Sequence, residues 1–208
     1  TQQPVVPILV LACACILVWS AVANAPDGKL HVRVLSGAEK PVVLLRTGGG
    51  RYVLVGGSLE ASTLAQQLGT ALPPFSRQID ALVIPACGKA DVSGLFDITE
   101  SFTLGKVYWG CDPERIQTTR RVYAAFQQAR IPQQRLQSTD QLNLGGAQLA
   151  FIFGEESLAA VQIDQANFHA LINYSAASSA INKPTSMFIG PEMPPASVAQ
   201  LILLTAAL

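Results

Sequence analysis

Two short apolar runs on either side of a helical segment constrain the fold of this chain more than any other feature. Residues 79–85 and 106–109 have the composition of buried strands. Residues 92–102 between them are predicted to form a short helix. Because a strand–helix–strand connection almost always returns to the same sheet, the two strands should be parallel neighbours. The chain is therefore predicted to contain an α/β domain.

The segments before this unit have the pattern of strands followed by a helix. Residues 30–35 alternate apolar and polar side chains, and residues 42–46 and 52–55 form two further strand-like runs. The glycines between the last two runs suit a hairpin. Ser58 is the predicted N-cap of a helix that ends at Pro73.

The second half of the chain is predicted to hold one long helix followed by sheet. Asp112 is the predicted N-cap of this helix, Pro113 suits its first position, and its apolar stripe ends before Pro132. The elements predicted beyond it are two hairpins, a strand and a final apolar helix, at residues 142–153, 158–174, 185–189 and 196–208.

The N-terminal segment is apolar enough to cross a membrane. Residues 5–23 contain no charged side chain and match one bilayer thickness as a helix. A cleavable signal peptide and a buried core helix are the alternatives, but no basic region precedes the run. We therefore expect an anchor at residues 1–26 and a domain at residues 27–208. The predicted lipid-facing positions are Val5, Ile8, Leu11, Ile16 and Trp19.

The charge composition argues against electrostatic capture of nucleic acid. The chain has 14 basic and 14 acidic residues, so its net charge is zero, and only 13% of its residues are charged. Nucleic-acid binding relies on clustered Lys and Arg that displace phosphate counterions. The arginines at 115, 120, 121 and 130 are expected to form a solvated helix face, with a polyanion patch as the alternative.

One stretch of the sequence carries a resemblance to a known family. Residues 77–95 read R-Q-I-D-A-L-V-I-P-A-C-G-K-A-D-V-S-G-L. They resemble the pattern R-x-I-D-x-L-V-L-T-H-x-H-x-D-H-x-G-G-L of the metallo-β-lactamase-like domain that ends ComEC-type competence DNA-uptake channel proteins. The resemblance extends from residue 30 to about residue 153. It implies a truncated αββα-type fold that follows a transmembrane helix.

The resemblance does not include the metal ligands of that family. Such sites cluster imidazole and carboxylate donors to hold ions that acidify water. The family's ligand positions correspond here to Gly56, Ala86, Gly88, Ala90 and Asp91. The two histidines of the chain, at 31 and 169, each lie inside a predicted strand and far from this motif. We therefore expect no metal cofactor and no hydrolysis of the kind associated with the fold.

The cysteines leave two alternatives open. Cys87 and Cys111 each close a predicted buried strand, so their Cα atoms could fall within disulfide reach. Unlinked thiols are the state that the sequence favours, and a disulfide would require an oxidising compartment. A nucleophilic Cys87 assisted by His31 or His169 is a further alternative, although nothing in the sequence places these residues together.

These observations predict a non-catalytic scaffold. We expect a single-pass accessory subunit of a larger complex in the bacterial inner membrane, in contact with other membrane-protein subunits and the bilayer. Lys29 and Arg33 after the anchor favour a cytoplasmic domain, whereas the family resemblance favours the extracytoplasmic side. A DNA-uptake component that contacts single-stranded DNA and a hydrolase with another site are the alternative functions.

Overall fold

A computed structural model describes residues 27–38, 40–73, 76–154, 157–165, 168–174 and 187–191. The predicted anchor at residues 1–26 and the predicted final helix at residues 196–208 lie outside these described residues. Within the described ranges, no helix has the length and apolarity needed to span a bilayer.

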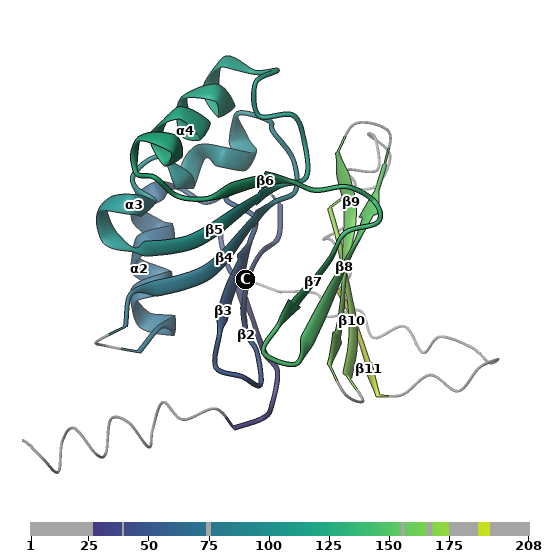
Figure 1. The fold of residues 1–208 in the computed structure, drawn as a ribbon. Coiled ribbons are helices and arrows are strands. Elements are labelled where there is room, and N and C mark those ends of the chain that lie inside the picture. Colours follow the sequence, from purple (N-terminus) through teal and green to yellow (C-terminus); the bar gives the residue numbers. More distant parts are fainter. Residues whose placement is uncertain are drawn as a thin grey trace, which may run out of the picture.

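The domain is built on two sheets that pack face to face (Figure 1). The first, sheet A, is antiparallel from β1 to β3 and parallel from β3 to β6. Its strands, in spatial order, are β1 (His31–Leu35), β2 (Val42–Arg46), β3 (Tyr52–Val55), β4 (Gln78–Ile84), β5 (Thr103–Trp109) and β6 (Gln133–Arg135). The predicted parallel pairing of the two apolar runs is confirmed, since Leu82 of β4 is in register with Val107 of β5.

The second, sheet B, is antiparallel throughout. Its strands, in spatial order, are β11 (Met187–Pro191), β10 (Phe168–Asn173), β9 (Leu158–Gln165), β8 (Ala147–Phe153) and β7 (Gln141–Leu144). The two hairpins predicted in this part of the chain are confirmed. The predicted strand at residues 185–189 lies two residues further along, as β11.

Helices cover the face of sheet A that points away from sheet B (Figure 1). These are α2 (Ala61–Ala71), the 3₁₀ helix η1 (Ala90–Leu95), α3 (Ile98–Ser101) and α4 (Gln117–Gln128). The described chain therefore has three layers: helices, sheet A and sheet B. This is the αββ part of the predicted αββα-type α/β fold.

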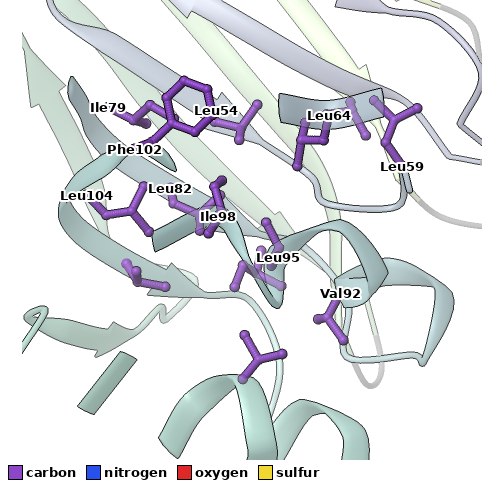
Figure 2. Packing of buried hydrophobic residues seen from close by; sticks show 14 of the residues in the cluster. Leu54, Leu59, Leu64, Ile79, Leu82, Val92, Leu95, Ile98, Phe102 and Leu104 are labelled. Atoms are coloured by element: carbon purple, nitrogen blue, oxygen red, sulfur yellow. The ribbon is translucent and has the colours of Figure 1, made fainter. Parts of the chain in front are cut away.

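Strand β4 shows why the central strands are apolar throughout. Leu82 and Ile84 point into the core under the helices, whereas Ala81 and Val83 point into the core between the two sheets. Since both faces of the strand are covered, apolar–polar alternation is absent from it. Figure 2 shows the first of these cores, where Leu54 and Leu82 of sheet A pack near Leu95 and Ile98.

Two predicted helix starts are wrong. Helix α2 begins at Ala61 after Glu60, and the hydroxyl of Ser58 instead donates to the carbonyl of Lys40 at 2.9 Å. Helix α4 begins at Gln117, because the carboxylate of Asp112 accepts from the N–H of Glu114 at 3.1 Å within a preceding turn. In both cases the polar side chain forms a hydrogen bond with the backbone of a loop or turn and not with the N–H groups at a helix start.

Two other predictions need correction in the same region. The segment predicted as one helix at residues 92–102 divides into η1 and α3, separated by Phe96 and Asp97. Strand β6 was not predicted, since its three residues, Gln-Gln-Arg, have no apolar pattern. It forms because it pairs with the end of β5.

Candidate functional site

The candidate site lies where β3 and β4 end. A small cavity there is lined by Gly56 after β3, Ala86 after β4, and Asp91 of η1. Three of the five positions singled out in the sequence therefore come together. Gly88 joins them through a hydrogen bond to Asp91, whereas Ala90 is exposed and does not line the cavity.

The carboxylate of Asp91 is the central polar group. Its side chain is only 9% exposed. Oδ2 accepts a hydrogen bond of 2.9 Å from the N–H of Gly88, which closes the turn between β4 and η1. Oδ1 lies 2.8 Å from Nζ of Lys40. Both carboxylate oxygens therefore have partners within the chain.

Lys40 reaches this carboxylate from the loop between β1 and β2. The hydroxyl of Ser58 donates to the carbonyl of Lys40. Pro41, which follows Lys40, packs closely against the end of β3. At that point Gly56 has a φ of +94°, and a Cβ there would lie 2.8 Å from the carbonyl oxygen of Pro41. Position 56 therefore has no room for a side chain larger than that of glycine.

Tyr174 closes the cavity from the side of sheet B. It follows β10, is buried, and its hydroxyl lies 3.5 Å from the carbonyl oxygen of Val55. Burial raises the pKa of this phenol well above its usual value, so Tyr174 is neutral at ordinary pH. Neither Lys40 nor Tyr174 was among the predicted site residues, because a lysine in a loop and a tyrosine at a strand end have no local pattern that indicates a site.

The residues present do not fit a divalent metal. The cavity measures about 10 Å³, roughly the volume that one water molecule requires. A catalytic zinc ion needs three or four donor groups, and this site offers one carboxylate with an ammonium beside it. In the part of the chain that the structure describes, no group of three His, Cys, Asp or Glu side chains is arranged to hold a metal.

The two histidines lie elsewhere and each pairs with an aspartate. Nε2 of His31 is 2.7 Å from Oδ2 of Asp27, and this hydrogen bond lowers the pKa of Asp27. Nδ1 of His169 is 2.6 Å from Oδ1 of Asp164 across the β9–β10 pair. Neither histidine lines the cavity.

A disulfide joins Cys87 and Cys111 at the rim of the site, where the sequence favoured free thiols. Their Cα atoms are 5.8 Å apart, because the cysteines follow the ends of the parallel neighbours β4 and β5. Around the bridge, the hydroxyl of Thr119 donates to the carbonyl of Cys87 at 2.7 Å. The N–H of Leu158 donates to the carbonyl of Gly110 at 3.0 Å and to that of Pro85 at 3.1 Å, and these two residues follow β5 and β4. The bridge therefore lies where sheet A, α4 and sheet B meet, and its sulfur atoms are not free nucleophiles.

A larger hollow of about 240 Å³ lies apart from this site, between α2 and α3. Small side chains, Ala61, Ala65 and Ser101, leave the space open, and Asp97 and Glu100 lie on its border. No histidine or cysteine lines it. The reactive groups that line the hollow are therefore two carboxylates and the hydroxyls of Ser62 and Ser101, and neither serine has a histidine beside it in the lining.

The buried phenol predicts a stability loss at alkaline pH. Because the folded pKa of Tyr174 is raised, its contribution is complete below the pKa of an unfolded tyrosine, 10.0, and is lost as the pH rises beyond it. We expect the free energy of unfolding to fall by up to about 1.4 kcal/mol per pH unit above that point. Urea unfolding between about pH 9 and pH 11 measures this slope. The Tyr174→Phe variant should show a shallower slope, and an unchanged slope would contradict the assignment.

Solved structures similar to this chain include proteins described as metallo-β-lactamases or as having the metallo-β-lactamase fold. The metallo-β-lactamase fold protein YhfI from Bacillus subtilis is 15% identical, with 68% of this chain and 60% of that chain covered and a TM-score of 0.49. Zinc-bound PqqB from Methylobacterium extorquens is 15% identical, with 74% and 52% covered and a TM-score of 0.42. A diphosphatase of the PhnP family is 20% identical, with 60% and 48% covered and a TM-score of 0.40.

The similarity to these proteins is one of mixed α/β fold, and this chain spans about half to three fifths of their length. No protein-family model matches the sequence, and no curated protein sequence does.

Proposed function

We propose that this domain is a non-catalytic scaffold, held at the bacterial inner membrane by residues 1–26 as an accessory subunit of a larger complex. The small cavity at the ends of β3 and β4 carries this proposal. Its volume of about 10 Å³ is too small for a substrate, and the two charged side chains among the described residues that line it, Lys40 and Asp91, neutralise each other. A site of this kind has no ionised group free to activate water.

The proposal includes the ComEC-type resemblance. Two residues of the resembled stretch, Asp80 and Gly94, have structural roles in this chain that support it. Asp80 accepts a hydrogen bond of 2.8 Å from the N–H of Tyr52 and so ties β4 to β3. Gly94 packs against the backbone of Leu59, and its N–H donates to the carbonyl of Gly57 at 3.0 Å. These roles need no catalytic chemistry, so they are compatible with a scaffold.

The outer face of sheet B is the surface that we propose for contact with another membrane-protein subunit. The strand registers place mainly amide and apolar side chains on it: Gln141, Asn143, Gln148, Ala150, Ile152, Gln162, Leu171 and Asn173. Its acidic side chain, Asp164, pairs with His169, whose Nδ1 lies 2.6 Å from Oδ1 of Asp164. A face poor in charge loses little solvation energy when a partner covers it.

A charge on this face should disrupt the complex. Ile152 is 45% exposed, so Ile152→Glu should leave folding intact and reduce recovery of partner subunits with the chain by at least about tenfold, or about 1.4 kcal/mol. Ile116→Glu is the matched control, because Ile116 is 38% exposed but lies in the helical layer. Quantitative mass spectrometry of the purified native membrane complex makes the measurement.

Several outcomes would reject the scaffold. Equal recovery from both variants would contradict the contact surface. Zinc or manganese bound to the purified chain above about half an equivalent would instead favour a hydrolase. Salt-sensitive binding of single-stranded DNA would favour the DNA-uptake component.

We place the domain on the extracytoplasmic side of the membrane. The Cys87–Cys111 bridge supports this side, because disulfides persist in oxidising compartments and are rare in the cytosol. Thiol alkylation of the denatured chain taken from cells tests the placement. Cys87 and Cys111 are expected to react with the alkylating agent only after reduction. Both should react without reduction if the domain is cytoplasmic.

A further inference from the structure

The buried carboxylate of Asp91 requires a nearby positive charge. A carboxylate that is 9% exposed has lost most of its hydration, and this loss is unfavourable unless a counter-charge replaces it. The hydrogen bond from the N–H of Gly88 supplies only part of this compensation. Among the described residues that line the cavity, Lys40 has the one cationic side chain.

We infer that the ammonium group of Lys40 is the resident cation of this site, a monovalent and covalently tethered ion where the resembled fold binds metals. This inference rests on the proposed function, because it explains how the site remains stable without metal ligands. The position of Nζ, 2.8 Å from Oδ1 of Asp91, is that of a direct ionic hydrogen bond. Oδ2 faces the N–H of Gly88, so the carboxylate binds one donor on each side.

The tether also has a structural consequence for the loop between β1 and β2. Lys40 is held at its carbonyl by Ser58 and at its ammonium by Asp91, so both ends of the residue are fixed. The loop thereby lies across the end of β3, where Pro41 contacts Gly56. Lys40 therefore supplies the cation of the site and also holds the β1–β2 loop over the cavity.

The exposure of Lys40 makes the inference testable by chemical rescue. Its side chain is 36% exposed, so truncation to alanine opens a path from solvent to Asp91. A small primary ammonium ion should then occupy the vacated position, with its N–H groups donating to the carboxylate. Ethylammonium has these donors, whereas tetramethylammonium has the same charge and no N–H group.

The experiment measures thermal unfolding midpoints of the full chain. We expect Lys40→Ala to lower the midpoint by about 3–6 °C. Ethylammonium chloride at about 0.1 M should restore at least half of this loss, and tetramethylammonium chloride at the same concentration should not. The Lys40→Ala/Asp91→Asn double variant should show no rescue, and neither should Asp91→Asn alone.

Each outcome bears on a different claim. Equal rescue by the two ammonium salts, or rescue of the double variant, would overturn the tethered cation, since general ionic effects would then account for the shift. Absence of any rescue would also overturn it and leave the scaffold proposal unaffected. If zinc or manganese raises the midpoint of the unmodified chain, the scaffold proposal fails instead, whatever the result with ethylammonium.

Discussion

Removal of the Cys87–Cys111 disulfide is expected to lower the free energy of unfolding by about 3 kcal/mol. The bridge links residues that are 24 positions apart, and it restricts the unfolded chain over a loop of that length. It also joins the ends of β4 and β5 beside the contact of Leu158 with both strand ends. Urea unfolding of the Cys87→Ser/Cys111→Ser variant, compared with the oxidised chain, measures the loss.

The reduced chain separates the effect of the bond from that of the substitutions. Reduction of the unmodified chain should give the same loss as the double serine variant within about 1 kcal/mol. If the oxidised and reduced chains unfold at the same urea concentration, the bridge does not stabilise the junction between sheet A and sheet B.

Replacement of Gly94 by alanine is expected to have an effect of similar size, about 3 kcal/mol. A Cβ at this position would lie 2.3 Å from the carbonyl oxygen of Leu59, and backbone cannot move aside as a flexible side chain can. The substitution would also separate η1 from Gly57, whose carbonyl accepts the N–H of Gly94. The helix that carries Asp91 would shift with it, so the cavity should open as stability falls.

Gly69 provides the matched control for this substitution. It lies in α2, and a Cβ there would meet no atom within 4 Å. Gly69→Ala should therefore raise the free energy of unfolding by about 0.5–1 kcal/mol, because alanine restricts the unfolded chain and favours helix. If the Gly94→Ala variant is as stable as Gly69→Ala, η1 does not depend on the close approach of Gly94 to the backbone of Leu59.

Local sequence patterns predicted the order of the elements well and their ends less well. The strands Val42–Arg46 and Tyr52–Val55 have the predicted bounds, because a continuous apolar run next to glycines leaves few alternatives. The starts of α2 and α4 were misplaced, since Ser58 and Asp112 have partners in loops. Strand β6 depends on β5 for its partner, so no local pattern could identify it.

The sequence by itself determined the α/β order of the domain, because the strand and helix patterns follow from the order of apolar and polar residues along the chain. Only the tertiary structure decided what closes the site. Lys40, Asp91 and Tyr174 come from a loop, a 3₁₀ helix and the end of β10, and they meet because sheet B packs on sheet A. The disulfide was decided in the same way, since it needs two strand ends held 5.8 Å apart, a distance that spacing along the chain does not specify.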